Sequence, residues 1–574
     1  MVTTIVIKKG EIMKILKTAL ILLCVLLFIN SCKDKESKQE LALASIDLLR
    51  GELLLCGDGQ FGELKFSLSC NYETRPTFDL GMALLHSFQY TEAEKAFVKV
   101  IDADPNCPMA YWGVAMSIYH AAWFPPKEKE LIKGVEILKI AKALSMDEKQ
   151  RDYINAIDAF YTNWENEDHQ TRAKLFENKM EQIYLKYPDD VEAAIFYSLA
   201  LYSTRDRVGK EYDNERKAGI ILESLFKTNP NHPGIAHYII HNYDNPVLAP
   251  KALETARRYA AIAPSSSHAQ HMPSHIFTRL GIWEESIESN LLSAESSRCY
   301  TESANIEEAY FEELHAIDYL IYAYLQKGDN KNAKEQYTLI KELEAFHETN
   351  LTASIYPIAI IPARIALENR DWDQAAHLNL QEIELNWNDH PWSKAVHHFA
   401  KSLGASQTKD FSLANQEIEM LKIMRQNLID QEDKTKSIQI KLVEIQIKTA
   451  QAWIYYRNNN PIKGLDLMLE AVEIERKTSK HPLTPGDVLP AIELLGDMLL
   501  EMGRNEEALI SYQENLKRHP NRFNGLYGAA KAAKNVGNKE QATTYFKSLL
   551  SLVEKSGSER PEILEAKAFI KQSV

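Results

Sequence analysis

Two stretches far apart in this chain of 574 residues share one spacing of small, aromatic and proline residues. The first set is Gly81, Ala93, Phe97 and Pro105, at intervals of 12, 4 and 8 residues. The second set is Gly496, Ala508, Tyr512 and Pro520, at the same intervals. A small residue where two helices touch, an aromatic residue packed against it and a proline that ends the second helix predict a helical hairpin.

The second pattern recurs 34 residues later, where Ala542 and Phe546 follow Ala508 and Tyr512. This period and spacing are those of the tetratricopeptide repeat (TPR). Units between the two ends are degenerate and keep only some of the marker residues, among them Gly281, Gly328, Ala333, Tyr337, Trp372 and Ala375. Because one hairpin cannot bury its apolar face alone, the units must stack. The sequence therefore predicts an all-α, TPR-like α-solenoid with a concave face.

The chain divides into segments by composition. Residues 32–73 hold Cys32, a short polar tether over residues 33–40 and a short irregular N-terminal segment over residues 41–73. This last segment is rich in glycine and is a cap or a loop. Residues 74–480 predict the degenerate hairpin array, and residues 491–574 predict a regular C-terminal TPR pair. Between them, residues 481–490 (HPLTPGDVLP) hold three prolines, which prevent helix continuation. This segment is either a linker or a rigid loop over the concave face, and we favour the loop.

The N-terminus has the features of a lipoprotein signal. Lys14 and Lys17 precede the apolar run 19–29, which is too short to span a bilayer and suits a signal-peptide core. The run leads to Ile29-Asn30-Ser31-Cys32, which resembles a bacterial lipobox. We expect cleavage of residues 1–31, lipidation of Cys32 and attachment to the outer membrane of a Gram-negative bacterium by lipid alone. An ordinary secretory signal is the alternative, and the true start is Met1 or Met13.

Four further cysteines lie in the body of the chain. Cys56 and Cys70 are close in sequence, and in an exported protein they would close a small loop as a disulfide. The alternative is two buried thiols. Cys107 and Cys299 read as solitary packing residues. The net charge of −14 and the lack of a basic stripe argue against a nucleic-acid partner.

Histidines gather in the centre of the sequence. His237 and His241 are four residues apart, as are His271 and His275, so each pair lies on one face of a helix. If the two pairs converge, four imidazoles would form a site for zinc, copper or nickel. The candidate outer members are His232, His268, His315, Asp244, His86 and His120. Asp318, three residues after His315, is a candidate to orient an imidazole.

Two alternatives to a metal site stay open. The histidines form a buried network of neutral rings, bonded to backbone, Tyr243 and Asp244, or they serve catalysis or ligand binding without metal. Pro273 lies between His271 and His275 and disturbs their helical spacing. The sequence contains no HExxH motif, no Walker loop, no GxGxxG that follows a strand and no GxSxG elbow, so enzymatic activity is uncertain and no catalytic residue is assigned.

Several stretches resemble a family of bacterial TPR proteins whose members are largely uncharacterised. They include HPGIAHYIIHNYD from His232, HMPSHIFTRLG from His271, and KHPLTPGDVLP from Lys480. The resemblance covers most of residues 70–550 and departs at His120-Ala121-Ala122-Trp123, where family members often read HPLW. It implies the TPR frame and brings no established activity.

The expected function is a non-enzymatic binding module that holds a protein or peptide in the concave groove. A fold-level analogy to SusD-like helical lipoproteins adds a glycan ligand and a role in polysaccharide uptake and degradation. The alternative is a metal-binding protein or metal-dependent enzyme built on His237, His241, His271 and His275, with a divalent transition metal as cofactor.

Overall fold

The computed structural model describes residues 42–64, 66, 70–122, 125–206 and 211–573. By its internal contacts the chain divides into residues 1–48 and residues 49–574. Of the first unit, only residues 42–48 are described, with a short helical turn at 42–44. The predicted signal peptide, its two alternative start residues and Cys32 lie outside the described residues.

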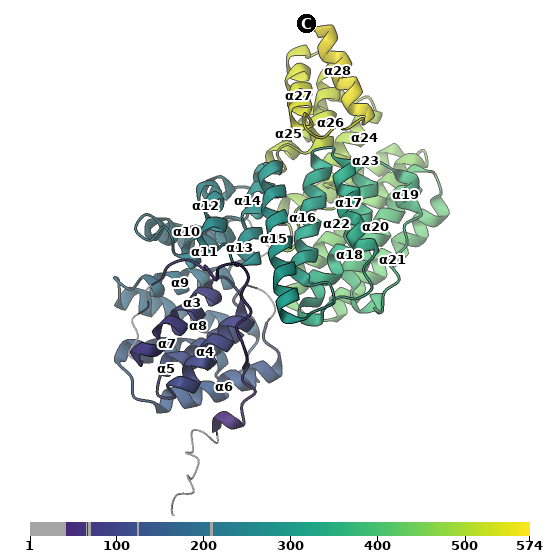
Figure 1. The fold of residues 1–574 in the computed structure, drawn as a ribbon. Coiled ribbons are helices and arrows are strands. Elements are labelled where there is room, and N and C mark those ends of the chain that lie inside the picture. The colour runs from purple at the N-terminus through teal and green to yellow at the C-terminus, as the bar shows by residue number, and fades with distance from the viewer. Residues whose placement is uncertain (1–41, 65, 67–69, 123–124, 207–210, 574) are drawn as a thin grey trace, which may run out of the picture. The chain divides into compact units, whose positions relative to one another are not determined.

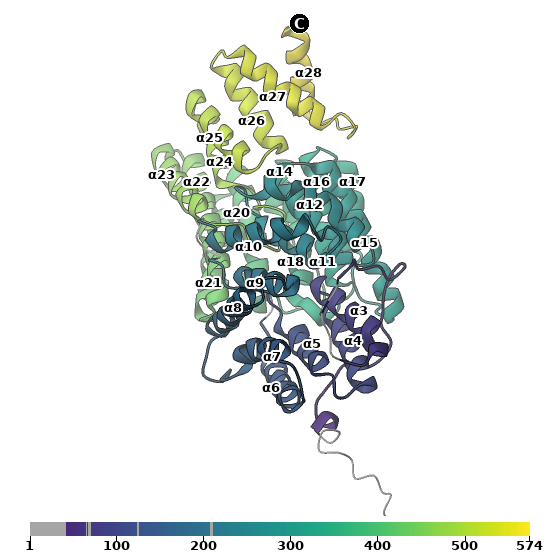
Figure 2. The same ribbon diagram turned by 90° about the vertical axis from the view of Figure 1, so that its left-hand side faces the viewer.

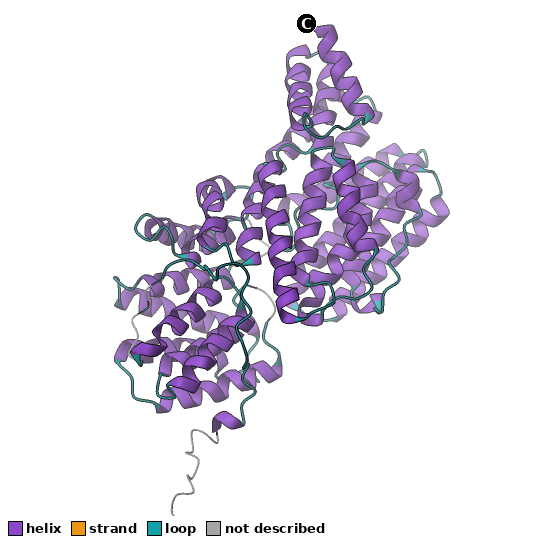
Figure 3. Cartoon of the chain, in the orientation of Figure 1, coloured by secondary structure: helices purple, strands orange, loops and turns teal. Residues whose placement is uncertain are grey.

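Within the described part of the second unit, the regular elements are helices joined by loops, and no strand is present (Figure 3). This confirms the predicted all-α, TPR-like architecture and the irregular N-terminal segment. The N-terminal helices are η1 (Tyr72–Thr74), α3 (Arg75–His86), α4 (Tyr90–Ala103), α5 (Pro108–Tyr119), α6 (Glu128–Ala143), α7 (Glu148–Tyr161), α8 (His169–Lys186) and α9 (Val191–Ser203).

The central helices carry the histidines. They are α10 (Asp213–Phe226), α11 (Pro233–Tyr243), α12 (Ala249–Ile262), α13 (Ser267–His271), α14 (Pro273–Leu280), α15 (Trp283–Ala304), α16 (Phe311–Gln326), α17 (Asn330–Lys341), η2 (Glu348–Asn350) and α18 (Leu351–Glu368). Residues 348–368 are long and apolar enough to cross a membrane by composition, but 83% of their most apolar stretch is buried inside the protein, as in a core helix.

The remaining helices complete the array toward the C-terminus (Figure 1). They are α19 (Trp372–Ala376), η3 (Trp387–Asp389), α20 (Pro391–Gln407), α21 (Phe411–Asp430), η4 (Lys434–Lys436), α22 (Ser437–Arg457), α23 (Pro461–Lys477), α24 (Ala491–Glu501), α25 (Asn505–Arg518), α26 (Phe523–Asn535), α27 (Lys539–Leu552) and α28 (Pro561–Ser573).

Most consecutive helices contact each other, and some alternate helices also touch. For example, α16 contacts α18, α18 contacts α20, and α20 contacts α22. Helices α24 to α27 follow one another in the same way in both views (Figures 1 and 2). Contacts of each hairpin with the next are what stacking of repeats requires.

The marker residues make the contacts that their spacing predicts. A Cβ atom added to Gly81 would lie 3.0 Å from the ring of Phe97, and one added to Gly496 would lie 2.8 Å from the ring of Tyr512. Only glycine lets the two helices of these hairpins approach this closely. Elsewhere, aspartates start the helices: the Asp147, Asp168 and Asp190 side chains each accept a hydrogen bond from a backbone N–H in the first turn.

The proline-rich segment 481–490 is a loop that lies against the first helices of several hairpins. Arg364 of α18 donates to the carbonyl oxygens of Gly486 and Asp487, each at 3.1 Å. Tyr319 of α16 donates to the carbonyl oxygen of Thr484 at 3.1 Å. The loop is thus hydrogen-bonded to α16 and α18.

The predicted disulfide is wrong. The structure pairs Cys56 with Cys299 and Cys70 with Cys107, at Cα–Cα distances of 5.9 and 4.9 Å. Cys56 lies in a segment that is bonded to a distant part of the chain, since the backbone N–H of Gln60 donates at 2.9 Å to Ser265 Oγ, between α12 and α13. Nearness in sequence therefore gave the wrong partner, and Cys107 and Cys299 are not solitary.

Candidate metal centre in the central helices

The histidines come from three neighbouring parts of the array. Helix α11 presents His237 and His241 on one face, with ring centroids 4.6 Å apart. His271 ends α13, Pro273 begins α14, and His275 lies in the first turn of α14. The predicted disturbance at Pro273 is real, yet the rings of His271 and His275 still approach to 4.9 Å.

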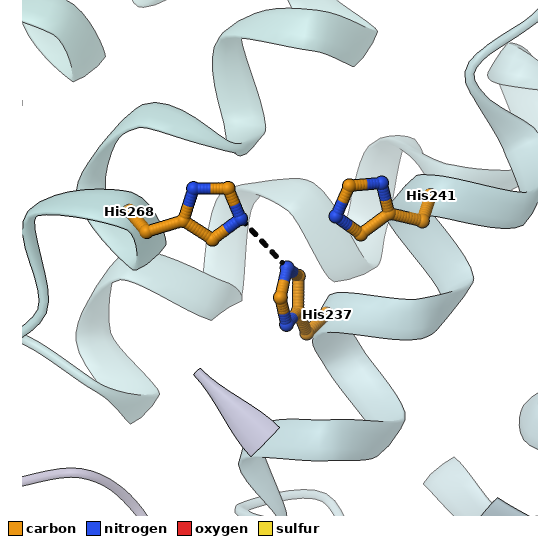
Figure 4. A group of neighbouring side chains, drawn as sticks. All are labelled: His237, His241 and His268. Atoms are coloured by element: carbon orange, nitrogen blue, oxygen red, sulfur yellow. Dashed lines mark hydrogen bonds between the residues drawn. The ribbon is translucent and has the colours of Figure 1, made fainter. Parts of the chain in front are cut away.

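The four predicted histidines do not form a single set. His237 and His241 group with His268, and His271 and His275 group with His315, with the candidate ligand atoms in each group within 4.8 Å of one another. Figure 4 shows the first group, whose three rings point toward one another. In each group two members are buried and the third is partly exposed. We call these the first triad (His237, His241, His268) and the second triad (His271, His275, His315).

In the second triad, hydrogen bonds fix where the protons of two rings lie. His271 Nδ1 lies 2.6 Å from Asn290 Oδ1. The Asn290 amide nitrogen donates to the Ser286 carbonyl oxygen at 2.7 Å, so its Oδ1 atom is the acceptor. The proton of His271 is therefore on Nδ1, and Nε2 carries a lone pair.

His275 is held in the same tautomer by a carboxylate. Its Nδ1 atom lies 3.0 Å from Asp244 Oδ2. Burial alone would raise the pKa of Asp244, but Lys480, Arg279 and His275 beside it hold that pKa well below its usual value. Because the ionised carboxylate only accepts hydrogen bonds, Nδ1 of His275 donates to it and Nε2 carries a lone pair.

Two lone pairs therefore face each other, because His271 Nε2 and His275 Nε2 are 3.0 Å apart. Neither atom has a proton to donate to the other. The Tyr319 hydroxyl lies 3.4 Å from His275 Nε2 and 3.1 Å from the Thr484 carbonyl oxygen. If the Tyr319 hydroxyl donated its hydrogen bond to His275 Nε2, His271 Nε2 would still receive no hydrogen bond from either group. The contact becomes favourable when a cation lies between the rings.

Protonation of one of the two rings is unfavourable, so a proton does not supply that cation. Burial lowers the pKa of His271 well below its ordinary value, and the neighbouring His275 lowers it further. Burial also lowers the pKa of His275, although Asp244 opposes this. Two neutral rings are therefore the stable state at neutral pH, and they offer lone pairs to a metal ion.

His315 completes the second triad from α16. Its ring centroid lies 4.3 Å from that of His271. His315 Nδ1 is buried and has no hydrogen-bond partner among the described residues. Around a tetrahedral zinc ion, ligand nitrogens are separated by about 3.3 Å. The second triad thus has both the donor set and nearly the spacing of a three-histidine metal site.

The first triad does not require a cation. His237 Nδ1 lies 2.6 Å from the His86 carbonyl oxygen and donates to it. His237 Nε2 lies 3.0 Å from His268 Nε2 (Figure 4). If His268 carries its proton on Nε2, this contact is an ordinary hydrogen bond. The close nitrogen contact of the first triad can therefore be a hydrogen bond, whereas the close nitrogen contact of the second triad cannot.

His86 and His232 form a third group with Glu192. The Glu192 carboxylate accepts from Nε2 of both histidines at 2.9 Å. Burial alone would raise the pKa of Glu192, but the two imidazoles lower it below its ordinary value. The hydrogen bond to Glu192 holds the ring of His86, and the backbone carbonyl oxygen of His86 accepts from His237 Nδ1.

The other candidate residues have different places. Asp244, predicted as an outer member, contacts His275, whereas Asp318 pairs with Arg364 at 3.1 Å and not with His315. His120 lies outside the three groups, and its ring is tilted against that of Tyr90 with centroids 4.6 Å apart. Sequence reasoning missed Glu192, Asn290, Tyr319, Arg279 and Lys480, because none of them stands at a recognisable spacing from the histidines.

The comparisons with known proteins bear on the fold. The tetratricopeptide repeat model matches residues 78–107, which contain Gly81, Ala93, Phe97 and Pro105. The chain therefore contains a TPR, a repeat type that forms helical hairpins and presents surfaces to proteins or peptides. No curated protein matches the sequence.

The solved structures that match this chain do so with low TM-scores and low sequence identity. A human IFIT1 dimer with m7Gppp-AAAA is 15% identical, with a TM-score of 0.33, and the alignment covers 84% of this chain and 98% of that one. Yeast Tom70 is 12% identical, with a TM-score of 0.32 and coverages of 87% and 96%. We infer nothing about function from these neighbours.

Proposed function

We propose that this protein binds a divalent transition metal ion through His271, His275 and His315, within a TPR-like helical frame. The observation that carries the proposal is the 3.0 Å contact between the Nε2 atoms of His271 and His275, both of which have their protons on the opposite nitrogen. A metal ion replaces the repulsion of two lone pairs by two coordinate bonds. Zinc, copper and nickel all accept imidazole ligands.

The surroundings of the triad suit this role. Three neutral imidazoles with an open fourth position are the ligand set of many catalytic zinc sites. Asp244 and Asn290 hold the remote nitrogens of two rings, as carboxylates and amides do around metal-bound histidines. The open position would accept water or a ligand, and Tyr319 is the nearest hydroxyl described at His275.

Metal analysis of the purified full-length protein tests the proposal. After dialysis against zinc-containing and then zinc-free buffer, wild type should retain one metal ion per chain, measured by inductively coupled plasma mass spectrometry. His271→Phe and His275→Phe should each lose it, whereas His397→Phe, a buried histidine on α20, should retain it. No retained metal in a folded wild-type protein would refute the proposal.

A second candidate function is binding of a protein or peptide by the hairpins, supported by the TPR match at residues 78–107. Because the loop 481–490 contacts α16 and α18, we propose that this role uses the hairpins that precede α16. A glycan ligand and a role in polysaccharide uptake rest on fold analogy, and affinity electrophoresis in neutral and charged polysaccharide gels tests them. Binding of either partner that survives His271→Phe would separate this function from the metal.

We also propose that the protein is exported and anchored to the outer membrane by lipid on Cys32. Two observations support this: the lipobox-like sequence before Cys32 and the two disulfides, which persist in oxidising compartments. Metabolic labelling with radioactive palmitate should mark wild type and not Cys32→Ser. Equal labelling of both would refute the anchor.

A further inference from the structure

A pocket of about 70 Å³, lined by described residues, lies beside Asp244. Helices α9 to α11, α14 and α25 and the loop after α23 contribute to its lining. Four cationic side chains line it, namely Arg205, Arg279, Lys480 and Arg518. Three acidic side chains do so as well, namely Asp206, Glu215 and Asp244. The pocket therefore carries excess positive charge in a chain whose net charge is −14.

Two of the cations are buried and share one carboxylate. The side chains of Arg279 and Lys480 are 9% and 4% exposed. Arg279 Nε donates to Asp244 Oδ1 at 2.7 Å, and Lys480 Nζ donates to Asp244 Oδ2 at 3.2 Å. One carboxylate cannot neutralise both the Arg279 guanidinium and the Lys480 ammonium, and buried charge without a counterion is unfavourable. Burial accordingly lowers the pKa of Lys480 to about 8, against the opposing effect of Asp244.

The other two cationic side chains, Arg205 and Arg518, donate hydrogen bonds to uncharged backbone carbonyl groups. Arg205 donates to the Tyr202 carbonyl oxygen. Arg518 donates to the carbonyl oxygens of Glu475 and Thr478. A guanidinium held by backbone carbonyls keeps its full charge, which attracts an anion to the pocket.

Asp244 connects this pocket to the second triad. Its Oδ2 atom accepts both from Lys480, which lines the pocket, and from His275, a proposed metal ligand. An anion bound to Lys480 and Arg279 would weaken their hold on Asp244 and leave more of its charge to His275. Ligand binding in the pocket would thereby change how strongly His275 donates to the metal.

We infer that this pocket binds the oxyanion group of a small organic ligand, a carboxylate or a phosphate, through Arg205, Arg279 and Lys480. Pockets that enclose drug-sized ligands measure about 300 to 1,000 Å³. At about 70 Å³ this one holds a small anion or the anionic end of a longer molecule. Binding to the pocket does not depend on the metal, whereas the coupling through Asp244 rests on the proposed function.

Isothermal titration calorimetry of the full-length protein with inorganic phosphate and with succinate tests the inference. Each anion is titrated into zinc-loaded and into EDTA-treated protein. We expect at least one of them to bind both forms, and the stronger binder identifies the ligand as a phosphate or a carboxylate. Arg205→Gln should weaken binding by about tenfold or more, the effect of losing one charge-assisted hydrogen bond.

Two further variants keep the result interpretable. Arg257→Gln is the matched control, because Arg257 pairs with Glu285 on the surface of α12 and is outside the pocket lining; it should bind like wild type. His271→Phe should lose the metal and still bind the anion, which separates failure of the metal site from failure of the pocket. The inference is overturned if neither anion binds, if Arg205→Gln and Lys480→Gln bind like wild type, or if binding requires zinc.

Discussion

Replacing His271 by phenylalanine should destabilise the metal-bound protein and leave the metal-free protein nearly unchanged. Phenylalanine keeps a ring against His315 and Tyr319, whose centroids lie 4.3 and 4.8 Å from the His271 ring. Without metal, the substitution loses the hydrogen bond to Asn290, worth about 1 kcal/mol. It also removes the repulsion between the lone pairs of His271 and His275. These two effects have opposite signs, so the net change is small.

With metal, the two proteins should differ clearly. A ligand that binds only the native state adds about 2.7 kcal/mol to the free energy of unfolding when its free concentration is 100 times its Kd. Zinc at that concentration should stabilise wild type by this amount. Because His271→Phe removes one of three ligands, we expect its zinc-dependent stabilisation to fall close to zero.

Urea unfolding followed by far-ultraviolet circular dichroism measures both quantities, in zinc and in EDTA. His397→Phe is the control, because His397 is a buried histidine of α20 outside the three groups; it should keep the zinc-dependent gain. Retention of the full gain by His271→Phe would refute the reasoning. So would a loss of about 3 kcal/mol or more in EDTA, the range of severe core defects.

Four other predictions follow from particular contacts. Peptide mapping under non-reducing conditions should find the disulfides Cys56–Cys299 and Cys70–Cys107, and a Cys56–Cys70 peptide would contradict these pairings. The double substitution Cys56→Ser with Cys299→Ser should lower the free energy of unfolding by about 2 to 5 kcal/mol. His268→Phe should leave one metal ion per chain in the mass-spectrometric assay, because the proposed ligands are His271, His275 and His315. Burial raises the pKa of Glu312 from 4.5 to about 7. Wild type should therefore lose stability as the pH rises from 4.5, the pKa of Glu312 in the unfolded chain, through 7. The melting temperature of Glu312→Gln should exceed that of wild type by more at pH 8 than at pH 5. Arg364→Met should cost about 3 to 5 kcal/mol by leaving Asp318 buried and unpaired, and hydrogen exchange should show faster exchange in the loop 481–490.

The sequence by itself determined the repeating architecture. Intervals of 12, 4 and 8 residues between Gly81, Ala93, Phe97 and Pro105 describe contacts inside one hairpin, and such contacts depend only on local helix geometry. The same logic placed His237 beside His241, since residues four apart share a helix face. The sequence also showed that histidines gather in the centre of the chain and that three prolines prevent a helix over residues 481–490.

Only the tertiary structure decided which groups meet across hairpins. It separated the predicted four-histidine set into two triads, and it brought His315 to His271 and His275. It also joined Asp244 to Lys480, 236 positions away, and Cys56 to Cys299, 243 positions away. Such contacts depend on the rotation and offset between stacked hairpins, which the packing of many side chains sets together. Spacing along the chain fixes a side chain's direction within its own helix and carries no information about the partner it meets on another.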